Sequence, residues 1–391
     1  MTKNVYIIGS KGIPAKYGGF ETFVEKLTEK QSNSDIQYHI ACMEENSKKS
    51  GITDKHFQYN GSQCFNIEVP NIGPAKAIVY DILALKKAIE ISKGNNDVNP
   101  VFYILACRIG PFIWKFKKQI EKMNGVLYVN PDGHEWLRQK WSLPVRKYWK
   151  YSENLMVKHS DLLICDSKNI QKYIEKEYKK YNPKTTYIAY GTDLEQSKLT
   201  SDSSIVRGWF DDKKIEENKY YLVVGRFVPE NNYETMIREF MKSNTKKSLV
   251  LVTNFEKNKF YEKLKTETKF EKDSRIKFVG TVYDQELLKY IRENAFAYLH
   301  GHEVGGTNPS LLEALHSTNV NLLLNIGFNR EVALEGAFYW DKNKLSQLID
   351  NLENGSLNLD ETSKVAKTRI EKQFNWNVIV SKYEEVFNEK I

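Results

Sequence analysis

Short apolar segments alternate with helical segments along the whole of this 391-residue chain. The apolar segments read as buried strands, and the segments between them have the spacing of amphipathic helices. Because parallel strands need helical crossovers, the alternation predicts α/β domains with doubly wound parallel sheets. The expected strands are Val5–Ile8, Tyr38–Cys42, Val101–Cys107, Val126–Val129, Leu162–Cys165, Tyr221–Val224, Leu249–Val252, Ile276–Val279, Phe296–His300 and Asn321–Leu324. The expected helices include Glu21–Lys30, Ile78–Lys93, Asn169–Tyr178 and Tyr233–Ser243.

A polar, charge-rich segment at Leu199–Asn218 divides the alternation into two series. It predicts an N-terminal Rossmann-like domain over residues 1–195 and a C-terminal one over residues 196–375. An amphipathic segment at 376–391 predicts a final helix. Ligands of open α/β sheets bind beyond the carboxyl ends of the strands, so two such domains facing each other would enclose a cleft.

The composition restricts the class of protein. A hydrophobic content of 41% supports real cores, and no apolar run reaches the ~20 residues that span a bilayer. The first residues lack the pattern of a signal peptide, so we expect a cytoplasmic protein. Four scattered cysteines, with no Cys-x-x-Cys spacing, predict buried reduced thiols.

The net charge of +8 is compatible with nucleic acid, an anionic small substrate or an anionic membrane surface as partner. Basic and aromatic residues interleave at Phe112–Lys118 and at Arg138–Tyr151, and no DNA- or RNA-binding motif surrounds either stretch. A solvated basic face is one interpretation of these stretches. Contact with the headgroup zone of a membrane is the other.

The most informative motif is His302–Leu315, which follows an apolar run that ends at His300. Two glycines permit a sharp turn, and Pro309 suits the first turn of a helix. Strand, glycine turn and helix start predict an anion site with free N–H groups at the helix N-terminus. Glu313, one turn into that helix, would repel phosphate but could accept hydrogen bonds from sugar hydroxyls. A nucleotide sugar combines these two features, a phosphate group and sugar hydroxyls.

A second glycine-rich loop, Gly9–Gly19, follows the first strand and leads into a helix near Phe20. It matches neither the dinucleotide-binding pattern nor the P-loop pattern. Its double glycine still offers backbone N–H groups to a ligand, and a tight structural turn is the alternative interpretation. Glu21 would favour the helix start through the helix dipole.

Gly225-Arg226 follows the strand Tyr221–Val224. From that position Arg226 could bind phosphate oxygens with both arms of its guanidinium, and a surface ion pair is the alternative. The next helix begins after Pro229–Asn232, where Asn232 is a plausible N-cap.

Asn130–Trp136 follows another strand and places Asp132, His134 and Glu135 beside a turn. Catalytic residues gather on loops of this kind. Asp132 or His134 could act as a base, and Asp132, Glu135 and Trp136 could bind an acceptor sugar, with Trp141 as a further ring for stacking. The alternative is an Asx-turn made by Asp132, with the tryptophans in the core.

His300, His302 and His316 surround the His302–Leu315 motif without the spacing of a zinc site, and no Asp-x-Asp pattern suggests a divalent ion. We therefore expect no metal, and a buried, hydrogen-bonded His300. Charge neutralisation on a diphosphate would fall to Arg226, to Lys11 or Lys16, and to helix dipoles.

These motifs together resemble a known family. The chain is similar to retaining glycosyltransferases of the GT-B fold in glycosyltransferase family 4, and more narrowly to bacterial rhamnosyltransferases of capsule and cell-wall synthesis. The resemblance spans nearly the full length, and its markers are the runs 9–24, 130–136, 225–232 and 305–313. It implies transfer of L-rhamnose from dTDP-rhamnose to a lipid-linked sugar acceptor at the inner face of the membrane, without a metal or other cofactor.

The resemblance also implies residue roles. The C-terminal domain would bind the nucleotide sugar, with Arg226 on the diphosphate and Glu313 on the ribose or deoxyribose. The N-terminal domain would bind the acceptor, and the last helix would pack back onto that domain. The implied donor-binding residues are Gly18, Gly19, Arg226, Phe278, Val279, Gly305, Gly306, Thr307, Asn308, Ser310, Leu311 and Glu313.

Two positions depart from the broad family. Gly305 stands where many members have a glutamate that contacts the donor sugar, and Glu303 lies two residues early. Asn231 stands where many members have a lysine, which removes one positive charge from the diphosphate clamp. A less polar sugar pocket suits a 6-deoxy sugar.

Other functions remain open at this point. One alternative is a glycosyltransferase that uses another donor, such as UDP-glucose. Another is an epimerase of the same GT-B fold, which would act on nucleotide sugars without transferring the sugar to an acceptor. A non-catalytic scaffold or nucleic-acid-binding protein would use the net charge, but the phosphate-type loop in each half argues against nucleic acid as the partner.

Overall fold

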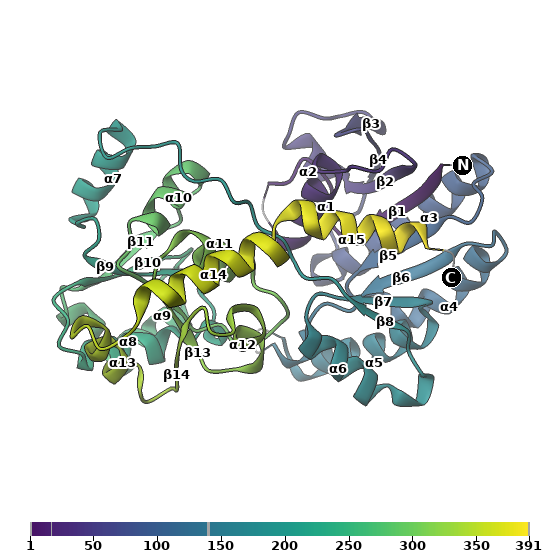
Figure 1. Ribbon diagram of the computed structural model, residues 1–391. Coiled ribbons are helices and arrows are strands. Elements are labelled where there is room, and N and C mark those ends of the chain that lie inside the picture. The colour runs from purple at the N-terminus through teal and green to yellow at the C-terminus, as the bar shows by residue number, and fades with distance from the viewer. Residues whose placement is uncertain (1, 17, 139–140, 390–391) are drawn as a thin grey trace. The chain divides into compact units, whose positions relative to one another are not determined.

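The computed structural model describes residues 2–16, 18–138 and 141–389, which form two compact units (Figure 1). The first unit contains the chain up to Gly191 together with the last helix from Trp376. The second contains Thr192–Asn375. Tyr17, Gln139 and Lys140, which fall within the motifs discussed above, lie outside the described residues, as do positions 390 and 391 of the expected last helix.

The first unit is built on an eight-stranded sheet with the order β3-β4-β2-β1-β5-β6-β7-β8. All neighbours pair in parallel except β3 and β4, which form an antiparallel hairpin. The strands are β1 (Lys3–Ile8), β2 (Ile36–Met43), β3 (His56–Tyr59), β4 (Ser62–Ile67), β5 (Val101–Leu105), β6 (Val126–Asn130), β7 (Leu162–Cys165) and β8 (Thr185–Tyr187). The helices are α1 (Gly19–Glu29), α2 (Glu44–Lys48), α3 (Lys76–Gly94), α4 (Gly110–Glu121), α5 (Leu143–His159), α6 (Lys168–Glu177) and α15 (Trp376–Asn388).

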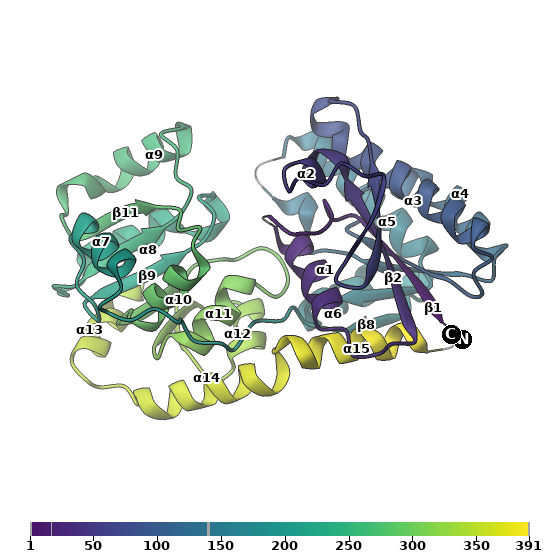
Figure 2. The same ribbon diagram turned by 90° about the horizontal axis from the view of Figure 1, so that it is seen from above.

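Helix α15 closes the core of the first unit although it comes from the end of the chain. Its Tyr383 ring packs 4.8 Å from Phe23 of α1, and Phe387 stacks on Tyr128 of β6. The Glu384 carboxylate accepts hydrogen bonds from the N–H and hydroxyl of Ser32. Figure 2 shows α15 alongside α1.

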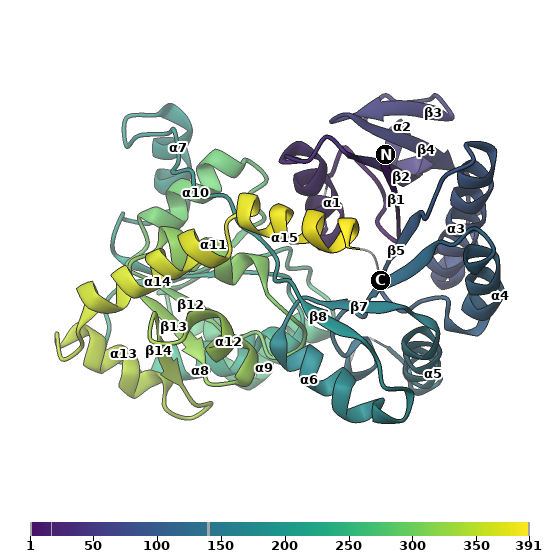
Figure 3. The ribbon, with the colours of Figure 1, turned by 45° about the vertical axis from the view of Figure 1, so that its right-hand side comes forward.

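The second unit is a six-stranded, all-parallel sheet with the order β11-β10-β9-β12-β13-β14. The strands are β9 (Tyr220–Val224), β10 (Ser248–Val252), β11 (Ile276–Gly280), β12 (Ala297–His300), β13 (Asn321–Leu324) and β14 (Phe338–Trp340), of which the last three lie side by side in Figure 3. The helices are α7 (Ser204–Lys213), α8 (Tyr233–Lys242), α9 (Lys259–Thr268), α10 (Gln285–Glu293), α11 (Pro309–Ser317), α12 (Gly327–Ala333), α13 (Leu345–Glu353) and α14 (Leu359–Gln373).

Alternation along β9 explains why helices cover both faces of this sheet. Tyr221 and Val223 pack into one core with Phe240 of α8, whereas Tyr220 and Leu222 pack into the opposite core with residues of α7 and α10. Successive strand residues point to opposite faces, so an apolar strand without polar alternation must be buried on both.

Each expected strand coincides with an observed one, with one clear error in length. The strand expected over Val101–Cys107 ends at Leu105, because Ala106 adopts a left-handed backbone with φ of 73°. The hairpin β3–β4 and the short edge strands β8 and β14 were not predicted, since they are short and polar or lie at sheet edges.

Candidate functional site

The loops of interest in the second unit lie at its topological switch point. The chain runs from β9 outward through β10 and β11, and then returns to the other side of β9 to build β12, β13 and β14. The carboxyl ends of β9 and β12 therefore adjoin at the position where open α/β sheets bind ligands in a crevice. Gly225–Asn232 follows β9, and Gly301–Asn308 follows β12.

Hydrogen bonds fasten these two loops together. The amide Nδ2 of Asn232 donates to the carbonyl of Gly301 at 2.7 Å, and the N–H of Glu303 donates to the carbonyl of Glu230 at 3.1 Å. Nδ1 of His302 lies 2.7 Å from Oδ1 of Asn231, whose Nδ2 in turn donates to the carbonyl of Arg226. The two loops therefore form one connected frame around Arg226.

Asn232 corrects one prediction. It stands at the N-cap position of α8, in a left-handed conformation with φ of 54°, but its side chain forms no cap hydrogen bond. The amide is used to hold Gly301 instead. Gly301 permits this approach because it has no Cβ, which would lie 2.6 Å from the carbonyl oxygen of Asn231.

The glycine turn after β12 keeps its own N–H groups open. Gly305 has φ of 129°, and no described residue accepts a hydrogen bond from the N–H of Gly305 or Gly306. Backbone N–H groups directed into a concave turn bind anions. Thr307, the next residue, is buried.

Helix α11 begins at Pro309 as predicted, but its N–H groups are already used. Oδ1 of Asn308 accepts the N–H of Ser310 at 3.0 Å, and the carbonyl of Asn308 accepts those of Leu311 and Leu312. The expectation of free N–H groups at this helix end is therefore wrong, because the asparagine caps the helix. The open donors belong to the glycine turn.

The side chains of Ser310 and Glu313 differ in whether they remain accessible to a ligand. The Ser310 hydroxyl donates to the carbonyl of Val224 and lies 3.0 Å from the hydroxyl of Tyr298, so it joins α11 to the sheet. The Glu313 side chain is 41% exposed, and its Oε2 lies 2.5 Å from Nη2 of the buried Arg292.

Arg226 is exposed, and no described residue pairs with its guanidinium, so the surface ion pair considered above does not form.

Phe278 and Val279 lie on β11. The Phe278 ring packs among the rings of Phe227, Phe255 and Phe270. Its side chain is therefore part of an aromatic cluster, so the expected contact with a base would fall to the backbone of this strand end.

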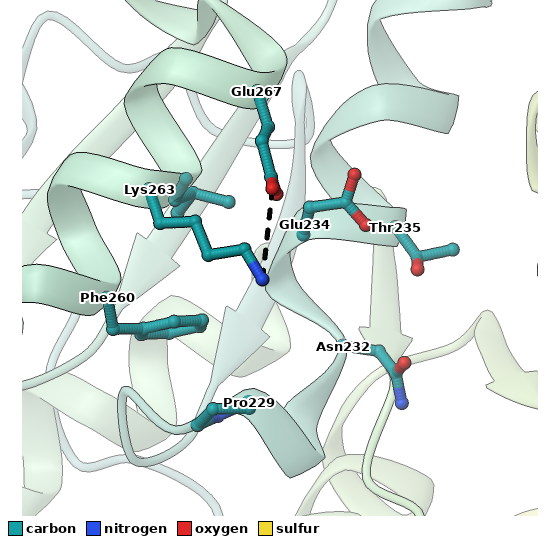
Figure 4. Close-up of a pocket in the computed structure, with 8 residues that line it drawn as sticks. Pro229, Asn232, Glu234, Thr235, Phe260, Lys263 and Glu267 are labelled. Carbon is teal, nitrogen blue, oxygen red and sulfur yellow. Dashed lines mark ion pairs between the residues drawn. The ribbon is translucent and has the colours of Figure 1, made fainter.

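A separate cavity of about 150 Å³ lies between the start of α8 and α9 (Figure 4). Its wall includes Pro229, Thr235 and Phe260, and Lys263 pairs with Glu267 across 3.8 Å at its rim. None of the predicted donor-binding residues lines it, so the cavity is distinct from the crevice at β9 and β12.

In the first unit the switch point lies between β1 and β5, where the chain turns from one half of the sheet to the other. There Nη1 of Arg108 donates to the carbonyl of Gly9 at 2.9 Å and to Oδ2 of the buried Asp81 at 3.0 Å. Burial acts to lower the pKa of Arg108, but the Asp81 carboxylate outweighs it, so the pKa is raised and the cation is secured. This pair was not predicted. The signal was an arginine shortly after a strand end, as at Arg226.

The loop after β1 is held by the helix that follows it. Oε1 of Glu21 accepts the N–H of Lys11 at 2.7 Å, and a Cβ on Gly18 would fall 1.9 Å from Oε2 of Glu21. Glu21 thus supports the loop directly, beyond the dipole effect expected of it. No described residue accepts the N–H of Gly19 or Phe20, so this helix start remains open to an anion.

The loop after β6 contains backbone strain. Oδ1 of Asn130 accepts the N–H of Asp132 at 2.7 Å, so the Asx-turn is made by Asn130 and not by Asp132. Asp132 and His134 both have positive φ, at 57° and 48°. Such conformations are costly and cluster at functional sites.

Several acidic and aromatic side chains converge on this loop. Asp132, Glu135 and Trp136 line one small hollow together with Cys107, Trp149 and Glu153.

Glu135 is partly committed, since it pairs with Arg138 at 2.5 Å and accepts from Nε1 of Trp141 at 2.8 Å. The Trp136 ring has the Lys150 ammonium 4.7 Å from its centre. Burial, together with Lys150, lowers the pKa of His134, whose ring lies 4.2 Å from that of Tyr173.

The remaining cysteine and histidine predictions have mixed outcomes. All four cysteines are buried and free of disulfides, as predicted. His300 is buried, but its Nε2 finds no hydrogen-bond partner among the described residues, and burial lowers its pKa to about 3. His316 bonds the carbonyl of Leu194. Within the described ranges, no three His, Cys, Asp or Glu side chains are grouped to hold a metal ion.

The chain forms two Rossmann-like units with parallel sheets, and each has loops at its switch point of the kind that bind ligands. This arrangement defines a fold of the GT-B class. Residues 2–193 match the family described as "Domain of unknown function (DUF1972)". A search of curated proteins found no match.

Solved structures cover almost the whole chain. Sucrose-phosphate synthase from Thermosynechococcus elongatus has 16% identity and a TM-score of 0.76 over 98% of both chains. HepE from Anabaena, in complex with UDP, has 13% identity and a TM-score of 0.70 over 98% of this chain and 99% of its own. The E. coli trehalose-6-phosphate protein bound to UDP-2-fluoro glucose has 9% identity and a TM-score of 0.71 over 100% of both. The predicted GT-B fold is thereby confirmed.

Among the described helices, none is both long and apolar enough to span a bilayer.

Proposed function

We propose that the protein is a retaining glycosyltransferase that moves L-rhamnose from dTDP-rhamnose to a lipid-linked sugar acceptor in capsule or cell-wall polysaccharide synthesis. The observation that carries this proposal is the crevice of the second unit. The two flanking loops carry Arg226, which pairs with no described residue, and the N–H groups of Gly305 and Gly306, which no described residue accepts; the adjoining helix carries the half-exposed Glu313. The cation and the backbone N–H donors suit a diphosphate, and the carboxylate suits the hydroxyls of a sugar.

The proposed chemistry is stabilisation of a leaving nucleoside diphosphate. As the bond from the sugar to the diphosphate breaks, negative charge grows on the leaving oxygen. The Arg226 guanidinium and the N–H groups of the glycine turn would bind that charge more strongly than they bind the ground state. Several similar structures bind related ligands, since the HepE structures contain UDP or UDP-glucose.

The acceptor would bind in the first unit, at the loop after β6. The pKa of His134 is lowered by burial and by Lys150, so its ring is neutral near pH 7 and can accept a proton from an acceptor hydroxyl. Asp132 is the second candidate for this base, and Trp136 and Glu135 would contact the acceptor sugar. We place the protein in the cytoplasm, at the inner face of the membrane, where a lipid-linked acceptor is presented.

The proposed membrane contact rests on exposed side chains of α4 and α5 in the first unit. Phe112 and Trp114 of α4 and Leu143 and Tyr151 of α5 are exposed, and α4 packs against α5. The ammonium groups of Lys115 and Lys118 lie 5.7 and 5.0 Å from the centre of the Trp114 ring. Exposed aromatic rings among lysines suit the interface of an anionic membrane.

The test uses purified protein, membranes that carry a lipid-linked glucose, and a panel of nucleotide sugars. The proposal requires acceptor-dependent release of nucleoside diphosphate with dTDP-rhamnose. Turnover with UDP-glucose alone would contradict the assignment of dTDP-rhamnose as the donor but would support a glycosyltransferase reaction. Conversion of a nucleotide sugar without acceptor would instead identify an epimerase.

A further inference from the structure

We propose that Arg146 and Lys150 of helix α5 are positioning residues for the acceptor sugar, because together they hold Trp136 in one orientation. Their role rests on the proposed function, which places the acceptor at the ring of Trp136. Both residues belong to the basic and aromatic stretch Arg138–Tyr151, for which the sequence suggests only a solvated face or a membrane contact.

Trp136 lies in the short turn Glu135–Leu137, on the loop after β6. Its ring is half-buried and lines the small hollow that Asp132 and Glu135 also line. An aromatic ring in such a place offers an apolar platform to the C–H face of a sugar. The platform binds best when it is already ordered, because fixing a side chain on binding costs free energy.

Arg146 holds the main chain of this residue. Its Nε donates to the carbonyl of Trp136 at 2.7 Å. Because the donor is a guanidinium, the bond is stronger than one between two neutral groups. The backbone that carries the indole is thus tied to α5.

Lys150 holds the ring. Its ammonium lies 4.7 Å from the centre of the Trp136 ring, and tryptophan is the aromatic side chain that attracts a cation most strongly. The ring nitrogen Nε1 is buried and finds no hydrogen-bond acceptor among the described residues. The orientation of the indole therefore depends on packing and on this cation.

The ammonium of Lys150 is itself fixed from several sides. It lies 2.9 Å from Oε1 of Glu177 and 2.5 Å from the hydroxyl oxygen of Tyr173. That hydroxyl donates its own hydrogen to the buried Glu153 at 2.5 Å, which leaves its oxygen to accept from the ammonium. The rings of Tyr173 and Tyr178 lie 4.9 and 5.0 Å from the ammonium.

These contacts keep Lys150 charged. Burial acts to lower its pKa, but the hydrogen bonds with Tyr173 and Glu177 outweigh burial, so the pKa is raised. The cation that holds the Trp136 ring is therefore present at neutral pH.

Arg146 and Lys150 act from one face of α5. They are four positions apart in the helix, and residues at this spacing are neighbours on a helix surface. One side chain reaches the main chain of Trp136 and the other reaches its ring. The helix thus holds the residue at two points.

The experiment measures initial rates of the full-length protein with dTDP-rhamnose, and separately with UDP-glucose, while the amount of membrane carrying a lipid-linked glucose is varied. Lys150→Met keeps an unbranched stem and removes the ammonium. We expect its apparent KM for the acceptor to rise about 10-fold, which matches the loss of one desolvated cation–π contact. Its kcat should change little, because a stacking ring binds the acceptor equally in the ground and transition states.

Two further variants make the test specific. Arg146→Met should also raise the apparent KM for the acceptor. Lys150→Arg should restore the KM of the wild type, because a guanidinium also stacks on aromatic rings. If thermal melts show that Lys150→Met does not fold, the comparison of Arg146→Met with Lys150→Arg takes its place.

Lys147→Met is the matched control. It removes the same charge from the same helix, but Lys147 is exposed and neither pairs nor hydrogen-bonds with a described residue. It should keep the KM of the wild type, which separates a role at Trp136 from a general loss of positive charge near a membrane. Isothermal titration should show unchanged donor affinity in every variant, because the proposed donor site is in the second unit.

The outcomes separate the two claims. A wild type that transfers sugar, while Lys150→Met and Arg146→Met keep its acceptor KM, overturns the positioning role and leaves the proposed function intact. The same holds if Lys147→Met raises the KM as much as Lys150→Met does. A wild type that transfers no sugar from either donor overturns the proposed function and the positioning role together.

Discussion

The carboxylate of Glu313 is held by the guanidinium of Arg292, with Oε2 2.5 Å from Nη2. The two partners are unequally placed, since the side chain of Arg292 is 5% exposed and that of Glu313 is 41% exposed. One oxygen of Glu313 is held by the pair, while the side chain as a whole stays partly exposed to solvent. The structure thus holds this carboxylate in place from within the core.

This asymmetry predicts that the two partners have different effects on stability. Glu313→Ala leaves a buried cation without its partner and should lower the free energy of unfolding by about 3 kcal/mol. Arg292→Met removes the buried charge and leaves a carboxylate that water can solvate, so the loss should be about 1–2 kcal/mol. Urea denaturation of both variants measures the difference. Equal losses, or a larger loss for Arg292→Met, would contradict the account.

Arg226 should matter for turnover and not for folding. Arg226→Ala removes an exposed cation that no described residue pairs with, so the melting temperature should be unchanged. Loss of one electrostatic donor at a leaving group should lower kcat by about 100-fold or more. Arg238→Ala, on the exposed face of α8 and paired with Glu234, is the matched control. Activity equal to that of the control would remove Arg226 from the site.

The close contact between the loops after β9 and β12 predicts that Gly301 cannot be replaced without a loss of stability. A Cβ on Gly301 would meet the carbonyl oxygen of Asn231 at 2.6 Å, so Gly301→Ala should destabilise the protein by about 2–3 kcal/mol. Gly208 lies in the exposed interior of α7, where an added Cβ would meet nothing within 4 Å. Gly208→Ala should therefore stabilise the protein by about 1 kcal/mol. Opposite signs in thermal melts are the expected result.

Buried histidines predict a loss of stability in mild acid. Burial lowers the pKa of His39 to about 4 and that of His300 to about 3, below the value of about 6.5 in an unfolded chain. The unfolded state therefore binds more protons, and stability is present above pH 6.5 and lost as the pH falls toward 4. Urea midpoints at pH 7 and pH 5 measure this loss. His39→Gln should show a smaller one, and an unchanged pH dependence would refute the role of His39.

The exposed aromatic and apolar side chains of α4 and α5 predict binding to anionic vesicles. Trp114→Ser combined with Leu143→Ser should weaken flotation with phosphatidylglycerol vesicles by 10-fold or more, since each side chain contributes about 1.5–3 kcal/mol when buried. Tyr283→Ser, which removes an exposed ring from the second unit, should have no effect. Flotation that is equally weak for all three proteins would count against membrane contact through this face.

The sequence predicted the parts of the fold that depend on local pattern. Continuous apolar runs identified the parallel strands, and glycine and polar residues after them identified the loops at β1, β6, β9 and β12. These features follow from neighbours in the chain, because strand burial and turn chemistry are short-range properties.

Contacts between distant residues were not predictable in the same way. Arg108 meets Asp81 across 27 positions and Asn231 meets His302 across 71, and neither spacing has a local signature. Competition between local partners was also missed. Asn308 caps α11 and Asn232 does not cap α8, although both are suitable N-cap residues, because Asn232 finds the carbonyl of Gly301 within reach.

The left-handed backbone at Gly305 limits how this site can be altered. With φ of 129°, position 305 lies in a conformation that L side chains rarely adopt. A glutamate introduced there, as in the broader family that the chain resembles, would strain the backbone of the turn. We therefore do not expect that single exchange to convert donor specificity. Under the proposed function, a change of donor sugar would require rebuilding the whole segment between β12 and α11, because one substitution at position 305 does not relieve the constraint on the backbone.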